Sequence, residues 1–206
     1  MKENEKKNVN PVVRTSLLFF LAFTIICGGI YTGICTGIAQ LLFPDKANGS
    51  IIEVDGKTYG SALLAQEFAG DEYLWGRIMN VDTGTYTDDD GNPAMYSGPS
   101  NKTPAGEELE ALVAERVAKI KASNPDMGDT PIPVDLVTAS GSGLDPDISP
   151  AGAEYQVKRI AKARNMSEDD VRAVIDKYTT GRSFGVFGEP AVNVLKVNLA
   201  LDGILK

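Results

Sequence analysis

The sequence contains no histidine and only two cysteines. Imidazole is the general base of Ser-His-Asp and Cys-His catalysis and a frequent zinc ligand, so its absence excludes those mechanisms and any zinc site with a histidine ligand. Cys27 and Cys35 both lie in one long apolar run, and residues 44–206 hold no cysteine. That part of the chain can therefore function in an oxidising compartment without disulfides or exposed thiols.

Basic residues are in the minority. The 206 residues include 20 Lys or Arg and 28 Asp or Glu, which gives a formal net charge of −8. The imbalance is concentrated in residues 44–206, where 16 basic and 26 acidic residues give a net charge of −10. A surface of this sign repels phosphate backbones, so we expect no nucleic-acid partner.

Charge is missing altogether from residues 15–43. This apolar run is long enough for a helix to cross a hydrocarbon core of about 30 Å, which predicts a transmembrane helix over residues 15–43. A cleaved signal peptide is the alternative, because Gly37-Ile38-Ala39 resembles a small-residue cleavage site. The run is about twice as long as the apolar part of a signal sequence, so a membrane span is the preferred interpretation.

The charges that flank this run predict its orientation. The basic residues before it are Lys2, Lys6, Lys7 and Arg14. Positive charge tends to stay on the cytoplasmic side of a membrane protein. We therefore expect a single-pass protein with residues 1–14 in the cytoplasm and residues 44–206 outside.

Glycine recurs every four residues within the predicted span, at Gly29, Gly33 and Gly37. A smooth glycine face allows a second helix to approach closely enough for backbone contact. The spacing therefore predicts a packing face, as expected for a subunit of a larger membrane complex. The alternative is the ordinary glycine content of membrane helices.

Residues 44–206 are predicted to form one α+β domain. A strand at residues 50–54 ends in an Asp55-Gly56 turn, and a short helix follows at residues 61–64. Residues 79–103 are rich in Asp, Gly, Asn and Pro and are predicted to form a long loop.

Three amphipathic helices are predicted further along the chain. Their starting signals, a hydroxyl residue before an apolar helical pattern, are Thr103-Pro104, Ser149-Pro150 and Ser167. We expect the first helix to end before Pro125 and the second at Asn165. In residues 192–201 apolar and polar side chains alternate, which favours a strand, with a helix as the alternative.

Two acidic motifs resemble known sites but lack essential residues. Asp82-Thr83-Gly84-Thr85 has neither the second Asp-Thr-Gly loop of an aspartic protease nor the lysine that follows the phosphorylated aspartate of P-type pumps. Around Asp88-Asp89-Asp90-Gly91, Tyr86 and Ser97 stand where a calcium loop needs ligands. We predict a solvated acidic turn there, and no catalytic or metal-binding residues in the chain.

The most unusual stretch is residues 134–150, in which a short apolar segment, predicted as a strand, leads into a turn rich in serine and glycine. Such turns can bind phosphate before a helix, but this one lacks a Gly-Lys-Ser/Thr ending and its aspartates would repel phosphate. The preferred hypothesis is a turn that docks on a partner protein. The residues predicted at the contact are Ser140, Gly141, Ser142, Gly143, Asp145 and Asp147.

A second glycine-rich turn covers residues 181–190. It holds Phe184 and Phe187 between glycines. The sequence leaves open whether these aromatic side chains belong to the core or to a contact surface.

From the span onward the sequence resembles the C subunit of the bacterial Kdp potassium-pumping ATPase. The residues that carry the resemblance are Gly60-Ser61 to Phe68, Tyr73 to Arg77, Ser97 to Asn101, Val134 to Pro150, Gln156, Arg159, Ala161, Arg164, and Gly188 to Pro190 with Val192 to Asp202. The chain departs from the family pattern at Asp147, where the family usually has histidine, at Ile78, where it has proline, and at Gly98-Pro99, where it has a doubled glycine.

The resemblance implies a non-catalytic subunit of an ATP-driven, high-affinity potassium importer in the bacterial plasma membrane. The implied partners are a channel-like potassium-binding subunit, a P-type catalytic subunit and a small single-span subunit. It also implies a catalytic chaperone that raises the affinity of the catalytic subunit for ATP. We expect no cofactor on this chain, because ATP and potassium are used by the complex.

Direct contact with ATP conflicts with the predicted orientation. ATP is cytoplasmic, whereas only residues 1–14 are expected on that side, and they have no phosphate-binding pattern. We therefore expect any effect on ATP affinity to be coupled through the membrane helices. The alternative function is that of an independent surface-anchored binding protein or enzyme.

Overall fold

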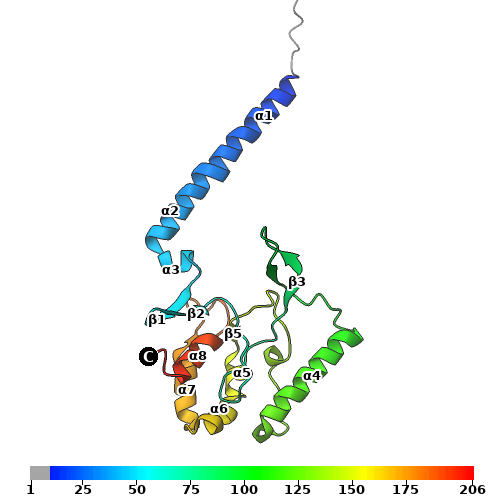
Figure 1. The fold of residues 1–206 in the computed structure, drawn as a ribbon, viewed down its shortest axis with the longest axis vertical. Helices are drawn as coiled ribbons and strands as arrows, with labels where there is room; N and C mark the ends of the chain where they lie inside the picture. Colours follow the sequence, from blue (N-terminus) through cyan, green and yellow to red (C-terminus); the bar gives the residue numbers. More distant parts are fainter. Residues whose placement is uncertain (1–9) are drawn as a thin grey trace, which may run out of the picture. The chain divides into compact units, whose positions relative to one another are not determined.

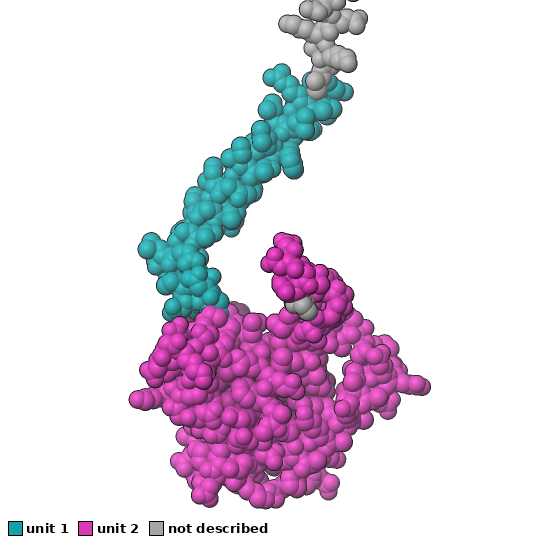
Figure 2. All heavy atoms as spheres, viewed as in Figure 1, with its two compact units in different colours: residues 1–50 teal, residues 51–206 magenta. Residues whose placement is uncertain are grey.

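The computed structural model describes residues 10–206, so Lys2, Lys6 and Lys7 of the predicted cytoplasmic segment lie outside the described residues. The chain divides into two compact units, residues 1–50 and residues 51–206 (Figure 2). The first unit contains the predicted span. The second is an α+β domain, as predicted (Figure 1).

The first unit is one long apolar helix from Pro11 to Leu42, followed by the short helix α3 (Pro44–Ala47). The long helix consists of α1 (Pro11–Phe23), the π-helical η1 (Thr24–Tyr31) and α2 (Thr32–Leu42). The Asn10 side chain caps its start by accepting a hydrogen bond from the Val12 N–H at 3.0 Å. No residue of the helix is buried within the chain. The helix has 32 residues and is long and apolar enough to cross a membrane.

The second unit begins with a β-hairpin. Strands β1 (Ile51–Val54) and β2 (Lys57–Ser61) pair antiparallel on either side of Asp55 and Gly56, whose φ angles are +52° and +75°. Two positive φ angles are typical of the tight hairpin turn that Asp-Gly favours, so the predicted strand and turn are confirmed. The predicted helix at residues 61–64 is wrong, because these residues make only a single turn.

A second hairpin occupies most of the predicted 79–103 loop, which corrects that prediction. Strands β3 (Val81–Thr87) and β4 (Pro93–Ser97) pair antiparallel, with an irregularity between Asp82 and Tyr86. The β3 side chains are mostly exposed, so the sequence lacks the alternation of apolar and polar residues that predicts a strand. The Asp88 carboxylate accepts hydrogen bonds from the N–H groups of Asp90 and Asn92, and the turn is exposed, as predicted.

Helix α4 (Glu107–Ser123) starts later than predicted. Thr103 does not cap it: the Thr103 carbonyl instead accepts a hydrogen bond from the Gly106 N–H at 3.0 Å, and the helix begins after this turn. Its end before Pro125 is confirmed, and the short helix η2 (Pro125–Met127) follows. The predicted strand after residue 134 is wrong. Residues Val134–Leu136 form the short helix η3 instead.

The next three helices follow the predicted starting signals. They are α5 (Pro150–Glu154), α6 (Val157–Arg164) and α7 (Glu168–Lys177). The Ser149 and Ser167 hydroxyls each accept a hydrogen bond, at 3.0 Å, from the backbone N–H three residues later. The helix predicted between Ser149 and Asn165 is divided into α5 and α6, and Asn165 ends α6 in the left-handed conformation.

The last apolar segment is mainly helical, which corrects the preference for a strand. A small antiparallel sheet has the strand order β5 (Asp147–Ile148), β7 (Ala191–Asn193), β6 (Thr179–Thr180), and α8 (Val194–Leu201) starts directly after β7. The Asn193 carbonyl oxygen Oδ1 caps α8 by accepting from the Lys196 N–H at 3.1 Å. The helix is buried on several sides, so its apolar residues do not follow the usual helical spacing, and the sequence suggested a strand. The buried residues are Val194, Leu195, Val197, Asn198 and Leu199.

The core of the domain surrounds part of residues 70–77, which belong to no helix or sheet. A turn at residues 70–73 leads into an extended segment that carries the buried Leu74 and Trp75. Two buried side-chain amides take the place of neighbouring strands. Asn198 of α8 pairs with both the N–H and the carbonyl of Leu74, at 2.8 and 2.9 Å. Gln156 pairs in the same way with Trp75, at 2.9 and 3.0 Å. Buried backbone groups need such partners, because each unpaired group costs about 1–3 kcal/mol.

Arginines hold the rest of this segment. Arg159 donates to the carbonyl oxygens of Gly70, Asp71 and Tyr73. Its guanidinium also lies 4.4 Å from the centre of the Trp75 ring, a cation–π distance. Arg164 donates to the Glu72 carbonyl at 2.6 Å and forms an ion pair with Asp202 at 2.6 Å. Helices α6 and α8 are thus tied to the same extended segment.

The pairing of Asn198 with Leu74 predicts a large loss of stability on its removal. Asn198→Ala leaves two buried backbone groups without partners, so we expect the free energy of unfolding to fall by about 3 kcal/mol. Urea titration of the full-length protein in detergent, followed by the emission of Trp75, the single tryptophan of the chain, measures this change. The control Lys158→Ala, at an exposed position near Gln156, should change stability by no more than about 0.5 kcal/mol. Equal stability of the two variants would contradict the prediction.

Candidate functional site

The serine- and glycine-rich turn at residues 140–144 is folded onto itself by its own side chains. The Ser140 hydroxyl accepts a hydrogen bond from the Gly143 N–H at 3.0 Å, and the Ser142 hydroxyl accepts from the Leu144 N–H at 3.2 Å. The two hydroxyl oxygens lie 3.2 Å apart, within hydrogen-bond distance. Ser140, Gly143 and Leu144 are buried, whereas Gly141 and Ser142 are exposed.

Gly143 is required by the close approach of its neighbours. Its φ angle is +71°, and a Cβ atom there would come within 2.5 Å of the Gly98 carbonyl oxygen and 2.6 Å of the Asn80 carbonyl oxygen. The Gly143 carbonyl accepts a hydrogen bond from the Asn80 N–H at 2.9 Å. The turn is therefore anchored on the base of the β3–β4 hairpin, and Gly143 serves this packing.

Asp145 has a basic partner from a distant part of the chain. The loop itself offers none, but Arg77 Nη1 lies 3.3 Å from Asp145 Oδ2, and Arg77 Nη2 donates to the Ala139 carbonyl at 3.0 Å. Asp145 Oδ1 also accepts from the Asp147 N–H at 3.1 Å. Arg77 thus joins the two ends of the turn, at Ala139 and Asp145, and it follows shortly after the buried Leu74 and Trp75.

Asp147 is half-buried on β5. Its carboxylate accepts a hydrogen bond at 3.0 Å from the Asn193 side-chain amide, which also donates to the Ala62 carbonyl at 3.0 Å. Burial raises the pKa of Asp147, and the negative charge of Asp145 adds to this, while the Asn193 hydrogen bond and the charge of Lys196 oppose it. Burial therefore disfavours the charged form of the Asp147 carboxyl group.

The structure brings the predicted docking residues together, but only part of the turn is available for contact. Ser140 and Gly143 build its interior, and Asp145 and Asp147 are engaged with Arg77 and Asn193. Of the six predicted residues, Gly141 and Ser142 are exposed. A docking surface at this turn would therefore consist mainly of its tip.

The glycines of the predicted packing face lie in two different helical segments. Gly29 belongs to the π-helical η1, whereas Gly33 and Gly37 lie one turn apart in α2. A Cβ atom built on any of the three would meet no atom within 4 Å, so this face is open. The wider turns of η1 change the phase of the helix, which leaves Gly33 and Gly37 as the pair with regular α-helical register.

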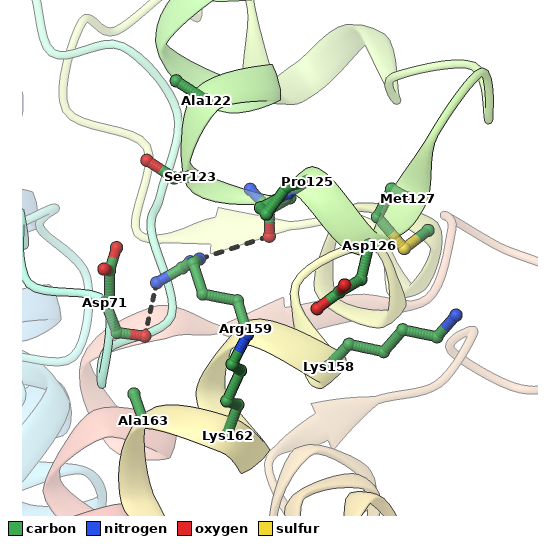
Figure 3. A pocket seen from close by; sticks show the side chains of 11 residues that line it. Asp71, Ala122, Ser123, Pro125, Asp126, Met127, Lys158, Arg159, Lys162 and Ala163 are labelled. Atoms are coloured by element: carbon green, nitrogen blue, oxygen red, sulfur yellow. Dashed lines mark hydrogen bonds between the residues drawn. The ribbon is translucent and has the colours of Figure 1, made fainter.

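A pocket of 460 Å³ lies between the end of α4 and α6, with Arg159 at its wall and Lys158 and Lys162 beside it (Figure 3). Arg159 is already held by the fold. Besides its three carbonyl acceptors, it donates to the Asn124 side chain at 3.2 Å and to Gln156 Oε1 at 2.6 Å. Burial lowers the pKa of Arg159 to about 10, which still leaves it charged at neutral pH. Arg159 therefore mainly braces the fold, through hydrogen bonds from all three of its nitrogen atoms.

One surface feature was not identified from the sequence, and the position of another was left open. The β3–β4 hairpin exposes Tyr86 and Tyr96, whose ring centres lie 5.3 Å apart. The sequence did not decide whether the 181–190 turn belongs to the core or to a contact surface, and the structure exposes both of its phenylalanines.

Among residues 10–206 no group of three or more acidic or cysteine side chains is placed to hold a metal ion.

Within the described part of the chain, these features define a class of protein: an apolar helix able to span a membrane, carrying an α+β domain whose polar motif residues brace the fold. A family model described as "K+-transporting ATPase, c chain" (KdpC) matches residues 13–203. The chain belongs to this family, so the resemblance found in the sequence is confirmed.

Relatives support the same assignment over nearly the whole length. A Clostridium botulinum protein (strain Eklund 17B) is 62% identical over 200 residues, which cover 97% of this chain and 100% of the relative. A Clostridium perfringens protein is 62% identical over 95% of this chain and 98% of its own length. One from Paraburkholderia phytofirmans is 46% identical over 92% and 95%, respectively. All three carry the name potassium-transporting ATPase KdpC subunit.

The raised pKa of Asp147 predicts that replacing it by a neutral residue increases the stability of the fold, by an amount that depends on pH. A carboxyl group whose pKa is higher in the folded than in the unfolded chain stabilises the fold below its unfolded pKa of about 3.8, and this contribution is lost as pH rises through the folded value. Asp147→Asn keeps an acceptor for Asn193 and should be more stable than the unchanged protein at pH 7, with the difference shrinking towards pH 4. Thermal unfolding across this range measures the effect. A constant difference at all pH values would contradict the assigned cause.

Proposed function

We propose that this chain is a non-catalytic accessory subunit of an ATP-driven potassium import complex in the bacterial plasma membrane. Its partners in this proposal are a channel-like potassium-binding subunit, a P-type catalytic subunit and a small single-span subunit. Membership in the K+-transporting ATPase c-chain family supports the potassium-transport context. The names of the relatives, which call them subunits, support a role within an assembly.

The observation that carries the proposal is the open face of the membrane helix. No residue of this helix is buried within the chain, and nothing approaches a Cβ built on Gly33 or Gly37. Lipid tails give no hydrophobic drive for helix association, so close packing on small residues is the usual basis of such contacts. The glycine face is therefore suited to receive a helix of another subunit.

The proposed site for the domain's contact with the complex is the turn of residues 140–147. Its internal hydrogen bonds and the Arg77–Asp145 ion pair stiffen it, so little conformational entropy is lost on docking. Gly141 and Ser142 would make the direct contacts. Asp145 and Asp147 would position them from behind.

The domain is proposed to lie outside the cytoplasm, with the short segment before the span inside. The basic residues that precede the span and the cysteine-free, acidic domain support this orientation. Any increase in the ATP affinity of the catalytic subunit is then transmitted through the membrane helices. Such coupling requires only that both sites bias one conformational equilibrium.

The role of the glycine face predicts that Gly33→Leu weakens the assembly. The leucine side chain would enter a contact in which backbones approach closely, so we expect the amount of partner subunits that co-purify with the chain to fall severalfold. The matched control is Cys35→Leu, which adds bulk about 200° further round α2. Co-purification of the potassium-transporting complex through a tag on this chain measures both variants.

Full co-purification of the Gly33→Leu variant, together with normal ATPase activity, would show that the glycines are ordinary residues of a span. Absence of all partner subunits from the unchanged chain would favour an independent surface-anchored protein. In the same assay Gly141→Arg tests the exposed tip of the turn. Because Gly141 lies at the surface and a Cβ atom there would meet nothing within 4 Å, this variant should reduce association without altering the emission of Trp75.

The proposed orientation predicts the side of the membrane on which the acidic turn can be labelled. Asp89→Cys, in a chain with Cys27 and Cys35 replaced by alanine, should react with a membrane-impermeant maleimide on intact cells, because the turn is exposed. Lys6→Cys is the control and should react only after lysis. The reverse pattern would place the domain in the cytoplasm and reopen direct contact with ATP.

A further inference from the structure

The turn of residues 181–190, between β6 and β7, exposes three large apolar side chains. Phe184 is 95% exposed, Phe187 68% and Val186 66%. No residue from 183 to 188 is charged. Contiguous apolar side chains are rarely left in solvent on a free-standing protein, and they commonly mark an interaction site.

The turn holds these side chains in a defined arrangement. Ser183 and Phe187 exchange two backbone hydrogen bonds, with N–H to carbonyl distances of 2.8 and 3.0 Å. Arg182 and Glu189 close the base with an ion pair at 2.5 Å. The turn is therefore organised before any partner arrives, which reduces the conformational entropy lost on binding.

The backbone conformation of Phe184 is a second, independent observation that points to a functional role for the exposed ring. Its φ angle is +54°, in the left-handed region that bulky residues other than glycine rarely adopt. Gly185 follows with a φ of +76°. The turn thus keeps a phenylalanine in an unfavourable conformation while its ring contacts almost nothing in the domain.

We propose that this apolar turn, residues 183–188, inserts into an uncharged hydrophobic pocket on another subunit of the potassium-transporting ATPase. The inference rests on the proposed function, because it requires a complex in which this chain is a subunit. Aromatic side chains that fill pockets supply much of the binding energy of protein interfaces. Phe184 and Phe187 are the expected anchors, with Val186 between them.

The charges around the turn favour a protein pocket over a lipid surface. Segments that bind bilayers by inserting apolar side chains usually carry lysine or arginine that reaches anionic headgroups. Here the adjacent Arg182 is paired with Glu189, and residues 44–206 carry a net charge of −10, which an anionic membrane would repel. An uncharged tip on an acidic domain suits an apolar pocket in a protein partner.

Photo-crosslinking in the assembled complex tests this inference directly. A photoreactive phenylalanine analogue, p-benzoylphenylalanine, is placed at position 184 of the full chain, and the complex is isolated from the membrane and irradiated. We expect an adduct with one protein subunit of the complex. The control position is Val134, which is also 70% exposed in the same domain and should give no such adduct. Adducts with lipid alone, or no adduct above the control, would overturn the inference.

Substitution provides the second measurement. The double variant Phe184→Asn and Phe187→Ser removes both rings, and asparagine tolerates the positive φ at position 184. We expect the co-purified partner subunits to fall about tenfold, with the Trp75 emission unchanged because both rings are exposed. Val186→Ala should have a smaller effect in the same direction, and the matched Val134→Ala none.

The outcomes separate this inference from the proposed function. If the unchanged chain co-purifies with its partners and the double variant does so equally well, the turn is not a docking element although the proposed function stands. If the unchanged chain co-purifies with no other subunit, the proposed function fails, and this inference fails with it.

Discussion

The domain depends on the pairing of two buried side-chain amides with the backbone of Leu74 and Trp75. The segment of residues 70–77 passes through the core without a neighbouring strand, and unpaired buried N–H and carbonyl groups would destabilise the fold. Asn198 and Gln156 supply the missing partners from α8 and from the junction between α5 and α6. The extended segment and these helices must therefore assemble together, since neither is complete without the other.

This arrangement explains what the family motif residues do. Gln156, Arg159 and Asn198 carry the resemblance to the c-chain family, and all three are turned inward onto the buried segment. Their hydrogen-bond capacity serves the fold, so they identify the family without defining a reaction. The surfaces proposed here to contact other subunits are elsewhere: the open helix face at Gly33, the exposed tip of the serine- and glycine-rich turn, and the apolar turn that carries Phe184.

These surfaces share a physical property that suits an accessory subunit. The two turns are closed by their own hydrogen bonds and by one ion pair each, the long-range pair Arg77–Asp145 and the local pair Arg182–Glu189. The membrane helix is likewise regular on the side of Gly33 and Gly37. Preorganised contacts lose little entropy on binding, so modest areas can stabilise a large assembly. In the proposed complex the chain would act through three rigid contacts.

The sequence by itself determined those features that depend on neighbouring residues: the long apolar helix, the Asp55-Gly56 turn, and the helix starts at Ser149 and Ser167. Local caps and turns are satisfied within a few residues, so their signals can be recognised in a single chain. Tertiary structure alone decided that residues 194–201 form a helix, that residues 81–97 form a hairpin and that Arg77 neutralises Asp145. The physical reason is distance along the chain. Asn198 and Leu74 are 124 residues apart, and no local pattern records which buried backbone group a distant amide will satisfy.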